Sequence, residues 1–137
     1  MTPGSRNANA SRGCHPGVVT LRCLLVDDNR HFLAAARELL EREGLVVVGA
    51  ATHITEAIGQ AAALAPDVAL VDIKLGAESG FQLARQLSVT PRPTPVIMIS
   101  THAGDDYADL VASSPAIGFL DKASLSARAV RELLSTV

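Results

Sequence analysis

Acidic side chains follow two apolar segments of this chain of 137 residues, and they are its best candidates for chemistry. Asp27 and Asp28 come directly after an apolar run. Asp72 stands at the end of a second run, residues 68–71. Carboxylates that lie within a few ångströms of one another repel, so all of them stay ionised only when a cation sits among them. Because hard oxygen ligands without His or Cys suit Mg2+, these residues predict a magnesium site if the fold brings them together.

A hydroxyl and an ammonium group follow two later apolar segments. Ser100 ends the run of residues 96–99, and Lys122 lies just past the run of residues 116–120. A metal ion and an ammonium group would neutralise the oxygens of a phosphoryl group while a carboxylate attacks phosphorus in line. The residue types therefore suit phosphoryl transfer to an aspartate. Taken singly they also have plain interpretations: a helix cap for Asp28, a strand-end hydroxyl and a surface lysine.

The segments between these residues predict the elements that must position them. Short apolar runs, typical of strands buried on both faces, alternate with stretches of helical periodicity. Such alternation indicates right-handed crossovers and hence a parallel sheet covered by helices on both faces. We expect a three-layer, doubly wound α/β domain with a five-stranded parallel sheet and five helices. The expected strands are residues 21–26, 45–51, 67–71, 96–99 and 116–120, and the expected helices are residues 32–40 (with Gly44 placed to end the helix), 55–65, 81–87, 105–112 and 125–134.

The candidate side chains all stand at the carboxyl ends of expected strands. In open parallel sheets, ligands bind outside these ends, at the point where the strand order reverses. If the first strand is central, its end and that of the third strand flank this point. Three carboxylates, a hydroxyl and an ammonium group would then converge in one shallow site.

Composition excludes several other classes of function. With 12 Lys and Arg against 14 Asp and Glu, the net charge of −2 disfavours a general nucleic-acid binder. Three Phe and one Tyr are too few aromatic residues for a platform that stacks bases. No apolar run approaches the ~20 residues of a membrane-spanning helix, and no Gly-rich turn for a dinucleotide follows the first expected strand. We therefore expect neither a nucleic-acid nor a membrane partner for this chain.

The amino-terminal segment differs from the rest. Residues 1–20 contain Pro, Gly, Ser, Asn and Arg but no acidic residue, so we expect a disordered leader. The segment also lacks the apolar stretch of a secretory signal, which predicts a cytoplasmic protein. Cys14 and Cys23 are the only two cysteines, too few for a disulfide framework or a zinc site.

Four stretches of the chain, in order and at compatible spacing, resemble the receiver domain of two-component response regulators. The resemblance is strongest to the subfamily usually fused to a LuxR-type DNA-binding domain. It implies a flavodoxin-like fold with strand order 2-1-3-4-5 over residues 21–137, with no effector domain in this chain. The matching stretches are LLVDDNRHFLAAARELLEREG, PDVALVDIKLGAESG, PVIMIS and GFLDKASL.

The resemblance also implies roles for the candidate site residues. Asp72 would be the phosphoacceptor. Mg2+ would be held by Asp72, by the acidic pair Asp27 and Asp28, and by the backbone carbonyl of Lys74. Lys122 would contact a phosphoryl oxygen.

Further residues match the conformational switch and the hydrolysis step of the family. Ser100 matches the switch hydroxyl that hydrogen-bonds the phosphoryl group, and Phe119 matches the rotating aromatic residue. Lys74 and His102 occupy positions that flank the path of attacking water, so we expect them to tune the lifetime of the acyl phosphate.

Four positions depart from the common pattern of the family. Ser100 stands in place of the more frequent Thr. Gly76 stands where Pro is frequent, which predicts a more mobile loop. Ala123 follows Lys122 where many receivers carry Pro, so the usual cis bond is not expected. Phe119 lacks a hydroxyl group, so its switch would work by packing alone.

The function that follows is a phosphorylation-dependent signalling switch with a histidine kinase as partner. The output would be a homodimer or downstream protein contact at the face of the fourth helix, fifth strand and fifth helix. We expect no enzyme activity beyond self-phosphorylation and self-dephosphorylation. Two alternatives stay open: a degenerate receiver that acts as a constitutive interaction module, and an aspartyl-phosphate phosphatase. The phosphatase is disfavoured because the second residue after Asp72 is Lys74 rather than an acid. The expected output face includes Tyr107, Leu110, Phe119 and residues near Ser124–Arg131.

Overall fold

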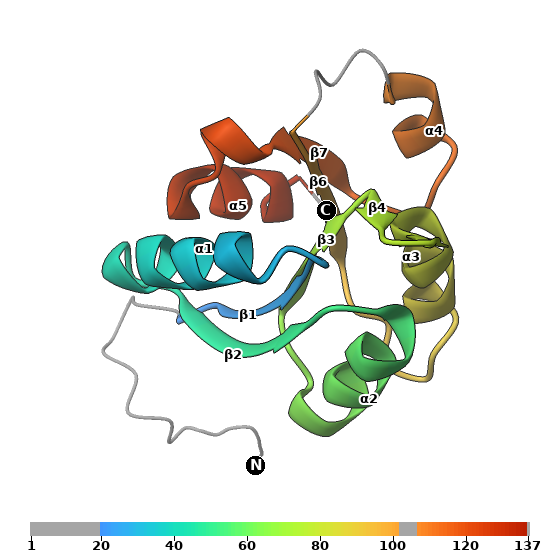
Figure 1. Cartoon of the computed structure of the whole chain (residues 1–137), viewed down its shortest axis with the longest axis horizontal. Coiled ribbons are helices and arrows are strands. Elements are labelled where there is room, and N and C mark those ends of the chain that lie inside the picture. Colours follow the sequence, from blue (N-terminus) through green and yellow to red (C-terminus); the bar gives the residue numbers. More distant parts are fainter. Residues whose placement is uncertain (1–19, 102–106, 137) are drawn as a thin grey trace.

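A computed structural model describes residues 20–101 and 107–136 and arranges them as a parallel sheet between layers of helices (Figure 1). The sheet order is β2-β1-β3-β6-β7, which confirms the expected order 2-1-3-4-5. The five helices are also confirmed in the described part of the chain. The expected leader, apart from its last residue, and His102 lie outside the described residues. The strands are β1 (Arg22–Val26), β2 (Val46–Ala51), β3 (Val68–Asp72), β6 (Val96–Ser100) and β7 (Gly118–Asp121); the helices are α1 (Arg30–Arg42), α2 (Ile54–Leu64), α3 (Gly80–Ser88), α4 (Ala108–Ala112) and α5 (Ala127–Leu134).

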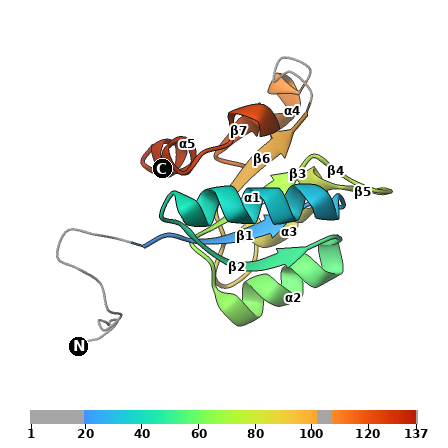
Figure 2. The ribbon, with the colours of Figure 1, turned by 60° about the vertical axis from the view of Figure 1, so that its left-hand side comes forward.

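Two hydrophobic clusters cover the two faces of the sheet. α1 and α5 pack on one face, and α2 and α3 pack on the other (Figure 1 and Figure 2). Successive residues of a strand point to opposite faces. In β1, Cys23 and Leu25 therefore belong to one cluster, whereas Leu24 and Val26 belong to the other. This double burial explains the unbroken apolar runs of the sequence.

Local signals fix the ends of the first two helices. The Asn29 side chain caps α1 by accepting a hydrogen bond from the backbone N–H of Phe32 at 3.1 Å. Gly44, with φ of +98°, ends the same helix as its position in the sequence predicts. α2 ends at Leu64, just before Pro66.

The segment after β3 differs from the expected loop. β4 (Lys74–Leu75) and β5 (Glu78–Ser79) form a short antiparallel hairpin. Its turn contains Gly76 with φ of +63°, a conformation closed to Pro, whose ring fixes φ near −65°. The departure from the frequent Pro at this position therefore permits the hairpin.

The carboxyl-terminal part shows three smaller differences. β7 begins at Gly118, two residues later than expected. A short 3-10 helix, η2 (Lys122–Ser124), follows it, and the Asp121 side chain caps this turn by accepting from the Ala123 N–H at 2.9 Å. α4 contributes no buried residue, and the first residues of its expected range lie outside the described part.

No helix in residues 20–101 and 107–136 has the length and apolar character needed to cross a bilayer.

Candidate functional site

Three carboxylates meet at the carboxyl edge of the sheet. β1 and β3 are neighbours with Val26 opposite Val71, so the residues that follow Val26 lie beside Asp72. One ligand oxygen from each of Asp27, Asp28 and Asp72 lies within 4.8 Å of the others. Asp27 is 0% and Asp72 9% exposed, while Asp28 is exposed to solvent. The convergence inferred from the strand ends is thus present in the structure.

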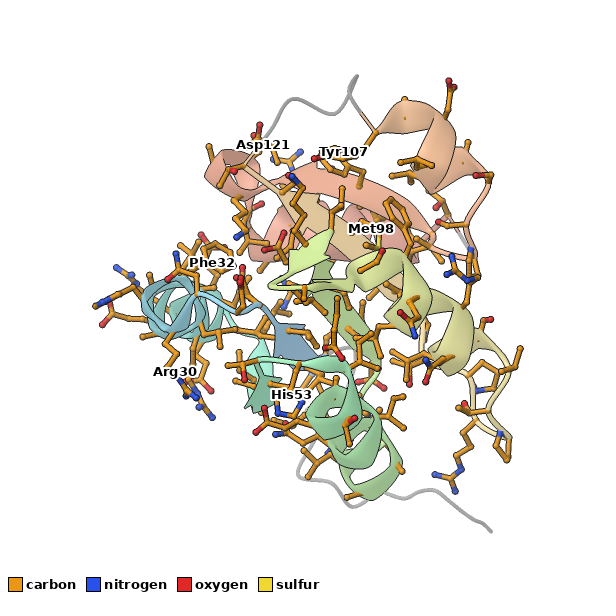
Figure 3. All side chains as sticks on the ribbon, turned by 45° about the vertical axis from the view of Figure 1, so that its right-hand side comes forward. Arg30, Phe32, His53, Met98, Tyr107 and Asp121 are labelled. Carbon is orange, nitrogen blue, oxygen red and sulfur yellow. The ribbon has the colours of Figure 1, made fainter. Side chains whose placement is uncertain are left out.

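The Lys122 ammonium group lies against this cluster. Its Nζ is 2.5 Å from Asp27 Oδ2 and 3.3 Å from Asp72 Oδ2. The same Nζ lies 4.4 Å from the centre of the Phe32 ring, within the range of a cation–π interaction. In Figure 3 the Phe32 side chain rises from α1 toward the strand ends, whereas Arg30 points away from them. The turn η2 and the ring of Phe32 together hold the ammonium group over the two buried carboxylates.

The charges of the site are unbalanced. Burial and, second, the charge of Asp27 together raise the pKa of Asp72 to about 6, against the opposing effect of the Lys122 ammonium. One ammonium group faces three carboxylates, so the cluster keeps an excess of negative charge among these residues. A cation at this position would remove the repulsion.

The oxygen atoms of Asp27 show why a cation fits. Asp27 Oδ1 accepts a hydrogen bond from the Asn29 N–H at 2.9 Å. Asp27 Oδ2 is buried and has no aligned hydrogen-bond donor, so its contact with Lys122 is an ion pair only. Together with the carboxylates of Asp28 and Asp72, Asp27 forms a set of hard oxygen ligands of the kind that Mg2+ takes. The residues present therefore fit a magnesium ion.

The remaining predicted residues lie at different distances from this centre. Ser100 ends β6 and is 4% exposed at the same edge, one residue beyond Ile99, the strand partner of Asp72. The Lys74 side chain is exposed, and its backbone N–H donates to Asp72 Oδ1 at 3.4 Å. Phe119 packs instead against the hydrophobic cluster under α2 and α3, as Tyr107 does. The predicted site residues thus divide into a carboxylate–lysine centre and an aromatic residue that packs against the core.

Two residues next to the centre were missed by sequence reasoning. Phe32 was interpreted only as part of the helical apolar pattern, and nothing in that pattern marks a partner for Lys122. Gly80 falls between the expected strand of residues 67–71 and the expected helix of residues 81–87. A Cβ atom at Gly80 would lie 2.0 Å from the backbone oxygen of Asp72, so only glycine fits there. A signal was available for Gly80, because an isolated glycine at a helix start often marks a close backbone approach.

Solved structures of other proteins share this fold. The signal receiver domain of the putative response regulator NarL from Mycobacterium tuberculosis is 28% identical, with a TM-score of 0.75, over 87% of this chain and 97% of that one. The response regulator domain of Thermotoga maritima CheB is also 28% identical, with a TM-score of 0.68, over 86% of this chain and 93% of that one.

Curated relatives are longer than this chain. The protein-glutamate methylesterase/protein-glutamine glutaminase 3 of Pseudomonas syringae pv. syringae (strain B728a) is 36% identical over 107 residues, 76% of this chain and 28% of the relative. A putative transcriptional regulator of Pseudomonas aeruginosa is 30% identical over 101 residues, 74% of this chain and 49% of the relative. The chain therefore spans between about a quarter and a half of these relatives.

The family model of the response regulator receiver domain matches residues 23–134, which include every strand and helix of the described sheet and its two covering layers except the first residue of β1. The carboxylate–lysine centre lies at the carboxyl edge of that matched segment. On this match the chain belongs to the response regulator receiver domain family.

Proposed function

We propose that this chain is a cytoplasmic signalling switch in which Asp72 accepts a phosphoryl group from a histidine kinase. The observation that carries the proposal is the position of Asp72. It is nearly buried at a strand end, beside Asp27 and Asp28, which could hold a metal ion together with it, and 3.3 Å from the Lys122 ammonium. This arrangement supplies a nucleophile, a place for a cation and a fixed positive charge.

Each residue of the site would have its own part in the transfer of the phosphoryl group. The pKa of about 6 leaves the Asp72 carboxylate mostly ionised at neutral pH, as a nucleophile must be. One carboxylate oxygen forms a bond to phosphorus while the bond between phosphorus and the imidazole nitrogen of the kinase breaks. Asp27, Asp28 and Asp72 would hold Mg2+, which would supply positive charge near the phosphoryl oxygens. Lys122 would contact one of these oxygens, and the Ser100 hydroxyl would donate to another.

Phosphorylation would alter the face built by α4, β7 and α5. A phosphoryl group adds negative charge and three acceptor oxygens close to Lys122. Lys122 directly follows β7, and Phe119 of the same strand packs against the same hydrophobic cluster as Tyr107, the residue before α4. A change in the position of Lys122 would therefore act through β7 on the neighbouring exposed face. This face includes Leu110, which is 53% exposed. A second copy of the chain or a downstream protein would bind there.

Mass spectrometry after treatment with acetyl phosphate tests the proposal. We expect one phosphoryl group per chain in the presence of Mg2+ and none with a chelator. Asp72→Asn should abolish the label, whereas Asp109→Asn, at an exposed position of α4, should keep it. A label that persists in Asp72→Asn would place the acceptor elsewhere. An unlabelled wild-type chain that also fails to bind beryllofluoride would favour a constitutive interaction module.

The tuning of hydrolysis is a separate part of the proposal. The exposed Lys74 side chain stands two residues after Asp72, next to the side from which water would approach. We expect Lys74→Ala and His102→Ala to change the half-life of the acyl phosphate. If both variants left the half-life unchanged, this role would be refuted while the phosphoacceptor role would stand.

A further inference from the structure

The hairpin of β4 and β5 is anchored at both of its ends. At one end it starts from the acidic site, where the Lys74 N–H donates to Asp72 Oδ1 at 3.4 Å. At the other end the Gly80 N–H donates at 2.7 Å to the carbonyl of Ile73, the residue that follows β3, and so closes the base of the hairpin. Between these points Glu78 reaches out of the hairpin, and its Oε1 accepts from the backbone N–H of Ile54 at 2.9 Å. Ile54 is the first residue of α2, so Glu78 ties the hairpin to a second element.

The turn between β2 and α2 supports both halves of the acidic site. On one side, the Ala51 carbonyl at the end of β2 accepts from the Asp27 N–H at 3.0 Å. On the other side, the Ile54 N–H holds Glu78. Only Thr52 and His53 separate these two contacts, and Figure 3 shows His53 at the start of α2. One short turn therefore links the backbone of the acidic pair to the segment that follows Asp72.

The tip of the hairpin lies next to the exposed member of the acidic cluster. A Cβ atom built at Gly76 would be 3.8 Å from Asp28 Oδ2. The hairpin thus borders Asp28 at its tip and contacts Asp72 at its base. A shift of the hairpin would change the space between these two carboxylates, where a cation would sit.

We infer that Glu78 is a positioning residue of this site: by fastening the hairpin to α2, it sets the spacing of the carboxylates and hence the affinity for Mg2+. The inference rests on the proposed function, since it takes the cluster to be the metal site of the phosphorylation reaction. Hydrogen-bonding groups around metal ligands commonly change metal affinity by about 10- to 100-fold when removed. Because Glu78 acts through the hairpin, we expect the lower end of this range for Glu78→Ala.

The chain contains a matched control. Glu43 Oε1 accepts from the backbone N–H of Ala127, the first residue of α5, at 2.7 Å. Both glutamates therefore bond the first N–H of a distant helix. Glu43 follows the 13 residues of α1, which places it about 20 Å along the helix from Asp28. Loss of either bond should lower the stability of the fold, but only Glu78 belongs to the hairpin.

The experiment compares Glu78→Ala, Glu78→Gln and Glu43→Ala in the full chain. Titration calorimetry gives the dissociation constant for Mg2+, and urea unfolding gives the stability of each variant. We expect about tenfold weaker Mg2+ binding for Glu78→Ala, wild-type binding within about threefold for Glu78→Gln because its amide oxygen still accepts, and unchanged binding for Glu43→Ala. In the metal-free protein, amide exchange of β4 and β5 should become faster in Glu78→Ala only.

Three results would overturn the inference. Wild-type Mg2+ affinity in Glu78→Ala, with Mg2+ binding intact in the wild-type chain, refutes the role of Glu78 alone. Equal weakening in Glu43→Ala would show that the effect reports general stability. A wild-type chain that binds no Mg2+ and takes up no phosphoryl group would refute the proposed function and the inference together.

Discussion

Replacing Asp72 by Asn should make the metal-free chain more stable at neutral pH, although it removes the proposed phosphoacceptor. The reason is the excess of negative charge in a nearly buried place. Burial first, and the charge of Asp27 second, raise the pKa of Asp72 from 3.8 to about 6, against the opposing effect of Lys122. Because the folded chain binds this proton more tightly than the unfolded chain does, ionisation of Asp72 lowers the free energy of unfolding.

The size of the effect follows from the shift in pKa. Each pKa unit corresponds to about 1.4 kcal/mol, so a rise from 3.8 to about 6 sets an upper limit of about 3 kcal/mol. Water on the open side of the cluster, where Asp28 is exposed, screens part of this field. We therefore expect Asp72→Asn to raise the free energy of unfolding by about 1–2 kcal/mol at pH 7.5, which corresponds to a rise of roughly 4–8 °C in the melting temperature.

The sign of the pH dependence follows from the same shift. Below pH 3.8 the carboxyl is protonated in both states, so the variant has no advantage from this group. The stability that the wild-type chain owes to the proton is lost as the pH rises from about 4 through about 6. The advantage of Asp72→Asn should therefore grow over this interval and stay constant above it.

Urea unfolding at pH 4.5 and pH 7.5, with a chelator and then with excess Mg2+, measures the effect. Mg2+ should stabilise the wild-type chain by mass action and reverse the order of the two stabilities. Asp109→Asn removes a carboxylate from an exposed position and should change little. A variant that is no more stable than the wild type at pH 7.5 without metal, or an advantage of the same size at pH 4.5, would refute the reasoning.

Three further predictions concern the charge of the site and the packing of the sheet and its helices. Lys122→Met leaves two nearly buried carboxylates without their ammonium partner, so urea unfolding of the metal-free chain should show a loss of about 3 kcal/mol, partly recovered with Mg2+. Gly80→Ala should lower stability by at least about 2 kcal/mol, because its methyl group would lie 2.0 Å from a backbone oxygen. Gly59→Ala, which meets nothing within 4 Å inside α2, should instead gain about 0.5–1 kcal/mol, and equal effects of the two alanines would contradict the geometry. Burial raises the pKa of Cys23 to about 12, so its thiol should not react with alkylating reagents at pH 8 until the chain unfolds; rapid labelling of the folded chain would contradict this.

The sheet and the acidic cluster could be predicted because both depend on patterns within single segments. The buried strand Val68–Val71 appears in the sequence as a continuous apolar run. The carboxyl ends of neighbouring parallel strands must meet at one edge, which brings Asp27 beside Asp72 once the strand order, implied by the resemblance, makes their strands neighbours. Caps such as Asn29 are equally local, because donor and acceptor are three residues apart.

The contacts that tune the site could not be predicted, because they join segments far apart in the sequence. Glu78 bonds a backbone N–H that lies 24 residues earlier, and no residue type marks a backbone donor. Lys122 meets the ring of Phe32 although the two residues are 90 positions apart in the sequence. The two-residue strands of the hairpin are too short to show a period of their own.

The exposed position of α4 has a consequence for how the domain would respond to its signal. Among the described residues, none of α4 is buried, while Tyr107 and Val111 only cover the edge of one hydrophobic cluster. A shift of α4 to a second position would therefore leave the buried residues of both clusters in place. Its free-energy cost would be a small fraction of the free energy of global unfolding. For two such arrangements, each 1.4 kcal/mol of differential interaction changes their ratio tenfold, so one or two new hydrogen bonds at the acidic site suffice to change which arrangement dominates. A fold of this kind can signal by changing the populations of two positions of one helix, while its core stays unaltered.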